Sequence, residues 1–474
     1  MGLQSQITTT SRTSSPEGPE RGRMPRWTTV AGAALWVAAA AVTAVLALSR
    51  YRGAIGPAPF TNATATDFGT FFAAGQAAAR GVNFYPAGGG YVFFAPLALV
   101  LSLFSHVDRV TVLKGWTVAE MVAFAAAAGS LVHALRSRLA AWWEPPALFA
   151  FCAVTGLHLW ALVIELFVNE DDIFVLLVLV LAAIALRDDH PVGFGVLVGV
   201  GMFLKVWPAL LIIAVIQKGI GARARIAAFV SLGVVGIVGL ATNLIPAGIH
   251  EFTGFFTLLL QKKSQPRLIS YSVGGIPRIL FSKTGLGRPV LVSGDVRYLA
   301  TGALVLWVLA LLIFCLSRPG DRMLAVFNVM FLAIFIDPVS HLQYSILVLP
   351  VVWFWVAQYR MFLDRRGWHG QGLAARIAVA VAVLAWYAVQ QRAWPNAPAT
   401  SSLVEGLTFY VNLALFTASV YGGRVLLGRD EQASPETTSA TDRVSEMNTT
   451  AAAPGPPVLT SPTSRLHSSL RSEA

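Results

Sequence analysis

Long uninterrupted apolar runs recur along nearly the whole chain, and they limit the folds open to it. "VAGAALWVAAAAVTAVLAL" begins at residue 30, and "LATGALVLWVLALLIFCL" begins at residue 299. A run of about 20 apolar residues matches the length of a helix that crosses the hydrocarbon core of a bilayer. Strands of a membrane barrel would alternate apolar and polar residues instead. The runs therefore predict an all-α polytopic membrane protein.

The charge content supports a membrane protein and argues against a soluble one. Charged residues make up 12% of the chain and apolar residues 55%, whereas about a quarter of a soluble domain is charged. The net charge is +11, but the basic residues cluster at the ends of apolar runs, where they set orientation. We therefore expect the lipid bilayer, and no nucleic acid, as a partner. Cys152 and Cys315 lie in apolar segments and predict no disulfide.

Basic loops suggest how the chain threads the bilayer. The sequence "PERGRMPR" precedes the first apolar run and places the N-terminus in the cytoplasm. The run 91–106 is about 16 residues long, and we interpret it as a juxtamembrane or re-entrant helix, because counting it as a span would move several basic loops outside. The prediction is about twelve transmembrane helices, near residues 28–48, 110–135, 146–167, 172–187, 191–204, 206–217, 226–246, 298–317, 322–336, 343–360, 374–391 and 405–426.

This threading defines the domain organisation that we expect. Residues 1–27 and 427–474 are rich in Ser, Thr and Pro and are predicted to be disordered cytoplasmic tails. Residues 28–426 form one transmembrane domain with external loops at 49–109 and 247–297. We expect a multi-pass protein of the plasma membrane with both termini in the cytoplasm.

Lys205 separates two short apolar runs. As a single helix of about 28 residues, the two runs would place Lys205 near the middle of the bilayer, where a charge is costly. Pro208 suits the first turn of a returning helix. We therefore predict a break before "WP" that brings Lys205 to the outer membrane surface.

Polar residues from distant parts of the sequence fall on the external side in this topology, and their gathering predicts a site. Each has a structural alternative: Asp67 as a helix cap, "NEDD" as a solvated turn, Lys205 as a snorkelling side chain and His341 as a polar loop residue. The helix that begins near Asp67 has apolar residues at the spacing of an amphipathic interfacial helix. The candidate residues are Asp67, Asn169, Asp171, Asp172, Lys205, Lys262, Lys263, Arg267, His341, Gln343 and Tyr344.

Several segments together resemble a family of membrane glycosyltransferases. They are "DFGTFFAAGQAAARGVNFYP", "FFAPLALVL", "VNEDDIFVLLVLVLAAIALRDDHPVGFGVLVGVGMFLKVWPALLI" and "DPVSHLQYSILVLP". In order and spacing they are similar to the GT-C class enzymes of family GT87 (DUF2029), which use polyprenyl-phosphate sugars. That family includes bacterial mannosyltransferases of phosphatidylinositol-mannoside and lipoglycan assembly, and related arabinofuranosyltransferases. The resemblance implies a GT-C-like fold with external juxtamembrane helices in the first loop.

The resemblance also implies roles for individual residues. Asp67 matches the catalytic base of the first external loop, and Lys205 matches a lysine near the carrier phosphate. Asn169 falls where many members have Gly-Gln-x-Asn, so that Asp171 and Asp172 depart from the pattern. The family's Ser-Pro-x-Ser-Trp-x-His-His becomes "DPVSHLQY", in which His341 stands alone.

The chemistry of the residues is compatible with these roles. One carboxylate near the acceptor suffices as a base, and Lys205, Lys262, Lys263 or Arg267 could neutralise the departing phosphate. We expect transfer of mannose from a polyprenyl-phosphate donor to an external glycolipid or polysaccharide of the cell envelope, with inversion and without a metal or other cofactor. The alternatives are an arabinofuranosyltransferase that uses a decaprenyl-phosphate donor and a lipid or polysaccharide transporter. A transporter would favour mid-bilayer charges and an internal repeat.

Overall fold

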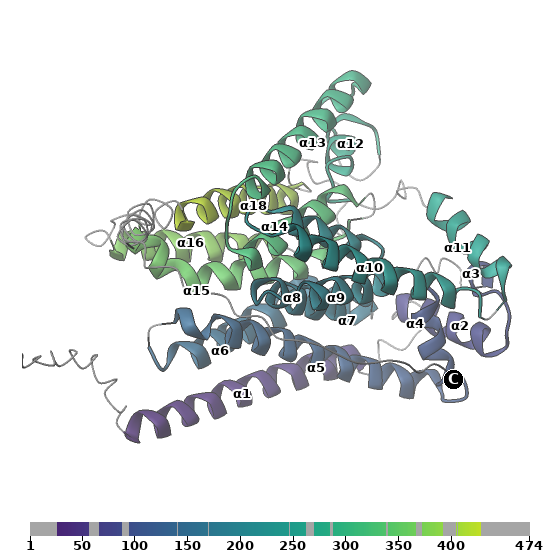
Figure 1. Ribbon diagram of the computed structural model, residues 1–474, viewed down its shortest axis with the longest axis horizontal. Helices are drawn as coiled ribbons and strands as arrows, with labels where there is room; N and C mark the ends of the chain where they lie inside the picture. The colour runs from purple at the N-terminus through teal and green to yellow at the C-terminus, as the bar shows by residue number, and fades with distance from the viewer. Residues whose placement is uncertain are drawn as a thin grey trace, which may run out of the picture. The chain divides into compact units, whose positions relative to one another are not determined.

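The computed structural model describes residues 26–55, 66–87, 94–139, 141–168, 170–245, 247–261, 270–284, 288–337, 340–365, 372–391, 404 and 406–427. Contacts divide the chain into two units, Met1–Leu426 and Leu427–Ala474. The predicted tails lie outside the described residues, apart from Arg26, Trp27 and Leu427 at their inner ends. Every regular element that the described residues form is a helix (Figure 1).

The helices follow one another with short connections. In chain order the first part forms α1 (Arg26–Ile55), α2 (Thr66–Ala79), α3 (Phe84–Ala87), α4 (Ala95–Ser102), α5 (Arg109–Leu135), η1 (Arg136–Arg138), α6 (Glu144–Leu157), α7 (Trp160–Val168), α8 (Asp172–Arg187), α9 (Pro191–Leu204) and η2 (Trp207–Ile216). The second part forms α10 (Ala222–Thr242), α11 (Ile249–Gln261), α12 (Gly275–Phe281), α13 (Gly294–Leu316), α14 (Arg322–Ile336), η3 (Leu342–Val348), α15 (Leu349–Arg365), α16 (Gly372–Gln390) and α18 (Leu407–Leu427).

Four helices among the described residues are long and apolar enough to cross a membrane: Thr28–Arg52, Arg109–Arg138, Ala222–Thr242 and Gly294–Leu316. They confirm the prediction of an all-α membrane protein, but they do not establish twelve spans. Several predicted spans form helices of only 14–16 residues. Such a helix is about 21–24 Å long, which is shorter than the hydrocarbon core of a bilayer. The predicted span 146–167 is divided into α6 and α7, and residues 207–216 form a 3-10 helix.

The helices differ in how much of each is buried, and this difference distinguishes outer helices from central ones. Only 11% of the α1 span and 17% of the α10 and α13 spans are buried, although all three are strongly apolar. A helix that exposes apolar side chains all round suits contact with lipid. α14, by contrast, is buried over nearly its whole length and packs against α8 and η2. The centre of the protein thus lies around α8, α14 and η3.

The segment predicted to be the first external loop contains a helix at the expected place. α2 begins at Thr66, and its residues Phe68, Phe71 and Phe72 are buried, as their spacing predicts. α2 packs against α4 so closely that a Cβ on Gly75 would lie 2.7 Å from the Cβ of Leu101. With only eight residues, α4 is too short to cross a membrane, which agrees with the interpretation of 91–106.

The predicted break at Lys205 is confirmed, and the snorkelling alternative for its side chain is wrong. α9 ends at Leu204, Lys205 is extended (φ −142°, ψ 145°), and Pro208 stands in the first turn of η2. The lysine side chain is buried in the protein and is only 5% exposed. It points into the protein because carboxylates on neighbouring helices bind it, as described next.

Candidate active site

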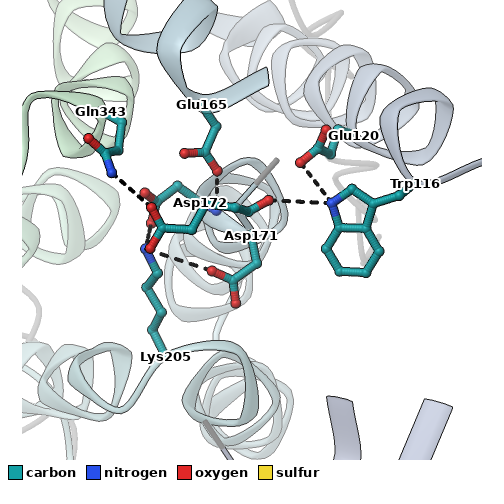
Figure 2. A network of polar contacts seen from close by, with 8 residues as sticks. Trp116, Glu120, Glu165, Asp171, Asp172, Lys205 and Gln343 are labelled. Atoms are coloured by element: carbon teal, nitrogen blue, oxygen red, sulfur yellow. Dashed lines mark hydrogen bonds and ion pairs between the residues drawn. The ribbon is translucent and has the colours of Figure 1, made fainter. Parts of the chain in front are cut away.

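One buried cluster joins the helix break to the acidic segment after α7 (Figure 2). The acid–lysine cluster consists of Glu120 on α5, Glu165 on α7, Glu170 and Asp171 before α8, Asp172 at the start of α8, and Lys205 after α9. All six residues are buried. Helix ends carry most of them, so their backbone positions are set by where α7, α8 and α9 stop and start.

Lys205 is the centre of this cluster. Its Nζ lies 2.7 Å from Glu170 Oε1 and 3.7 Å from Asp171 Oδ1, and it also bonds Asp172 Oδ1. The ammonium stands 4.3 Å from the centroid of the Tyr344 ring, which adds a cation–π contact. Breaking such a buried pair leaves uncompensated charge and costs about 3–5 kcal/mol.

The acidic segment is not a solvated turn. Glu170 is 8% exposed, and Asp171 and Asp172 are fully buried. Gln343 Nε2 donates to Glu170 Oε2 over 2.9 Å, and Trp116 Nε1 lies 3.4 Å from the Glu170 carbonyl oxygen. Residues of η3 and α5 therefore both contact Glu170 of the acidic segment.

Glu120 and Glu165 belong to the cluster but were not singled out from the sequence. Asp172 N donates to Glu165 Oε1 over 2.7 Å, and Trp116 Nε1 donates to Glu120 Oε1 over 2.9 Å. The signal that could have found them is a single carboxylate inside an apolar run, as in "VIELF" and "TVAEMV". Ionisable residues within membrane helices are functional candidates for that reason.

The cluster holds more acids than bases. Among the described residues, its buried oxygens without a hydrogen-bond partner are Glu120 Oε2, Glu165 Oε2, Asp172 Oδ2 and both carboxylate oxygens of Asp171. Such atoms are available to hydroxyl donors or to a cation. Oxygens of Glu165, Glu170 and Asp172 lie within 4.8 Å of one another, as a metal site would require, but Lys205 already supplies a positive charge to two of these residues.

Asp67 is next to the cluster rather than in it. It lies in the first turn of α2, where the helix dipole favours a carboxylate. Its neighbour Phe68 packs 5.9 Å from the ring of Trp116, and Phe71 packs 6.0 Å from the same ring. Because Trp116 hydrogen-bonds Glu120, one aromatic side chain joins the helix of Asp67 to the acid–lysine cluster.

Arg109 is a third residue that was not singled out from the sequence. Its guanidinium lies against Gly69 of α2, where an added Cβ would be 2.8 Å from Nη2. Gly69 is two residues after Asp67, so the Arg109 guanidinium lies against the first part of the helix that carries Asp67. The arginine begins α5, directly after the Asp108 cap.

The remaining candidates divide into those near the cluster and those that the structure does not describe. His341 is half-buried, and its ring lies 6.2 Å from that of Tyr344, so η3 brings His341, Gln343 and Tyr344 to the lysine side of the cluster. The predicted substrate-binding residue Asn169 and the predicted phosphate-binding residues Lys262, Lys263 and Arg267 lie outside the described residues.

The helical fold, with four helices that could cross a membrane and a buried cluster of charged residues, defines a membrane protein with an internal polar site. The sequence model of glycosyltransferase family 87 matches residues 84–338, more than half of the chain, and the chain belongs to that family. The protein is therefore a membrane glycosyltransferase. The matched region contains Arg109 and the whole acid–lysine cluster, whereas Asp67 and His341 lie outside it. Comparisons with curated proteins and with solved structures gave no match.

Proposed function

We propose that the protein transfers mannose from a polyprenyl-phosphate donor to a glycolipid or polysaccharide acceptor on the external face of the plasma membrane. The observation that carries the proposal is the first part of α2, which carries Asp67: the Arg109 guanidinium lies against its Gly69, and its Phe68 packs on Trp116, which hydrogen-bonds Glu120 of the buried cluster. Family membership supports sugar transfer as the reaction. A lipid-linked donor suits a site carried by a membrane fold.

The reaction needs one base, and Asp67 is our candidate. The acceptor hydroxyl oxygen attacks the anomeric carbon, and its proton passes to the Asp67 carboxylate. The bond between that carbon and the phosphate oxygen breaks, and the polyprenyl phosphate leaves with the electron pair. General-base assistance of this kind contributes about 10²–10⁴-fold to rate. A single displacement inverts the configuration at the anomeric carbon.

The departing phosphate gains negative charge, which a nearby cation would stabilise. Lys205, the cation expected from the sequence, already binds Glu170 and Asp172. We therefore assign Lys205 to holding the cluster together and Arg109 to the donor phosphate, since a guanidinium fits phosphate in a bidentate manner. Lys262, Lys263 and Arg267 remain proposed phosphate contacts.

The sugar itself is rich in hydroxyl donors. Both carboxylate oxygens of Asp171 and Oδ2 of Asp172 lack hydrogen-bond partners among the described residues. We propose that these oxygens, together with Gln343, His341 and Tyr344, receive the sugar. Unsatisfied buried acceptors favour a ligand that supplies donors, because an empty acceptor costs about 1–3 kcal/mol.

A donor-choice assay tests the proposal. The purified protein in liposomes is given radiolabelled polyprenyl-phosphate mannose, polyprenyl-phosphate arabinofuranose or a nucleotide-linked mannose, with a membrane glycolipid extract as acceptor. We expect label in the acceptor from polyprenyl-phosphate mannose alone. Transfer from the nucleotide sugar would refute a lipid-linked donor, and transfer of arabinofuranose would refute mannose.

A further inference from the structure

A cavity lies far from the acid–lysine cluster. It has a volume of about 480 Å³ and lies between α1, the end of α5 and the segment before α6. From Glu120 to Arg136 the α5–η1 helix advances 16 residues, or about 24 Å. The cavity is therefore at the other end of this span from the candidate active site. Its lining includes Trp36, Val132, His133, Arg136, Trp142 and Pro145.

The charge of the cavity comes from Arg136. Neighbouring arginines are paired: Arg138 lies 2.5 Å from Asp321, and Arg187 lies 2.7 Å from Asp188. The guanidinium of Arg136 is exposed and has no ion pair or side-chain hydrogen bond to any residue that the structure describes. His133, one turn earlier on α5, is also exposed and faces the same cavity. The cavity thus presents one guanidinium that no described residue neutralises, and beside it the imidazole of His133.

The rest of the cavity lining is largely apolar and adjoins exposed apolar side chains of α1. Trp36 is 42% exposed on α1, next to Leu35 and Val37, which are also exposed. The centroid of the Trp36 ring lies 5.7 Å from that of Phe149, and the Trp142 side chain lies against Gly32 of α1. Tryptophan is enriched at the level of lipid headgroups, where its ring is apolar and its N–H is polar.

The order of groups along the cavity matches a phospholipid. Arg136 stands at the end of the α5 span, and Trp36 lies eight residues, about 12 Å, inside the first residue of the α1 span. A cation at headgroup level is thus followed inward by indole rings and aliphatic side chains. Free phosphate would use only the outer part and would leave the apolar part without a partner.

We propose that this cavity binds an anionic phospholipid of the adjacent leaflet. The lipid phosphate accepts hydrogen bonds from Arg136 and His133, and the glycerol and first acyl carbons lie between Trp36 and Trp142. Basic pockets between transmembrane helices are known to select anionic headgroups, and arginine binds phosphate with paired N–H donors. The site is independent of the glycosyl donor and of the proposed function.

Native mass spectrometry of the delipidated full-length protein tests the site. Phosphatidylglycerol and phosphatidylcholine are titrated against the wild type, Arg136→Gln and the control Arg223→Gln, which removes an exposed arginine of α10 outside the cavity. We expect phosphatidylglycerol to bind more tightly than phosphatidylcholine, and Arg136→Gln to weaken its binding about fivefold, since one basic residue contributes about 1 kcal/mol. Arg223→Gln should bind like the wild type.

Two further arms separate the possible ligands and the two parts of the cavity. Inorganic phosphate at the same concentration as the lipid should not displace phosphatidylglycerol. Trp36→Ala should weaken the binding of phosphatidylglycerol, although Arg136 is still present. The proposal is overturned if Arg136→Gln binds phosphatidylglycerol as the wild type does, if phosphatidylcholine binds equally well, or if inorganic phosphate displaces the lipid.

Discussion

At the scale of single residues, Lys205 shows how a charge can be kept inside a membrane protein. The lysine is almost fully buried, yet it contacts three carboxylates and one aromatic ring. The desolvation of such a group is offset only when its partners remain in place. These contacts stabilise the buried ammonium, and the buried carboxylates in turn need Lys205 as their cation.

Replacing Lys205 with methionine should therefore destabilise the protein. The change leaves Glu170, Asp171 and Asp172 buried without their cation, and we expect a loss of about 3 kcal/mol or more. The double variant Lys205→Met/Asp172→Asn removes one carboxylate charge as well and should recover part of this loss. Thermal unfolding in detergent, followed by tryptophan fluorescence, measures both. Equal midpoints for the wild type and Lys205→Met would show that the ion pairs contribute nothing.

The protonation of Glu251 affects the stability of the protein. It lies on α11 and is fully buried, and its Oε1 accepts a hydrogen bond from Phe84 N over 3.0 Å. Burial raises the pKa of this carboxyl to about 7, although the bond from Phe84 N opposes the rise. In the unfolded chain the carboxyl ionises near its ordinary pKa of 4.5, so the folded protein binds the extra proton between these two values.

This difference predicts that stability falls as the pH rises from 4.5 to about 7 and changes little above it. Glu251→Gln keeps an acceptor for Phe84 N and removes the ionisation, so it should raise the unfolding midpoint at pH 8 and flatten its dependence on pH. Glu144→Gln, at the start of α6, is the matched control and should keep the slope of the wild type. An unchanged slope in Glu251→Gln would assign the pH dependence to other groups.

At the scale of the elements, hydropathy and helix signals predicted much of the fold. The spans at α1, α5, α10 and α13 follow from long apolar runs, and the break after α9 follows from Lys205 and Pro208. The shorter central helices were assigned as full spans because a buried helix and a membrane helix are equally apolar. Sequence alone therefore identified apolar helices but did not separate those that cross a bilayer from those that pack inside.

The candidate site was predictable from the sequence only in part. The residues that were not predicted are those whose role depends on tertiary packing. "NEDD", Lys205 and the segment around Gln343 stand out as polar groups at the ends of apolar runs. Glu120 and Glu165 lie inside helices, and their place in the cluster is evident only from the structure, where Glu120 pairs with Trp116 on the same helix and Glu165 accepts from Asp172 N of α8. Arg109 is one of many basic residues at the end of a span. Its relation to α2 depends on tertiary packing, which local sequence does not encode.

The contact of α2 with α4 gives a test at this scale. A methyl group on Gly75 would lie 2.7 Å from Leu101 Cβ and 2.8 Å from the Leu101 carbonyl carbon, so the helices would have to separate. We expect Gly75→Ala to cost about 1–3 kcal/mol and to reduce transferase activity by shifting Asp67. Gly115→Ala, on α5 where nothing lies within 4 Å of the added carbon, is the control. Full activity in Gly75→Ala would show that the position of α2 is not critical.

At the scale of the whole molecule, sidedness connects the fold to the proposed reaction. We propose that both termini face the cytoplasm and that Asp67 faces outside. Single cysteines at Arg80, after α2, and at Arg318, between α13 and α14, should then label differently in intact cells, after Cys152 and Cys315 are replaced. A membrane-impermeant maleimide should modify position 80 alone. Labelling of position 318 alone would invert the topology and place the candidate site inside.

The central claim is that Asp67 is the base of a membrane glycosyltransferase, and an isosteric substitution tests it most directly. Asp67→Asn keeps the size of the side chain and the first turn of α2 but removes the proton acceptor. Asp108→Asn is the matched control, because Asp108 is an exposed cap of α5 in the same loop and asparagine also caps helices. Both variants are compared with the wild type in transfer from radiolabelled polyprenyl-phosphate mannose at saturating donor. We expect a loss of at least about a hundredfold for Asp67→Asn and wild-type activity for Asp108→Asn. Near-normal transfer by a folded Asp67→Asn protein would contradict the central claim.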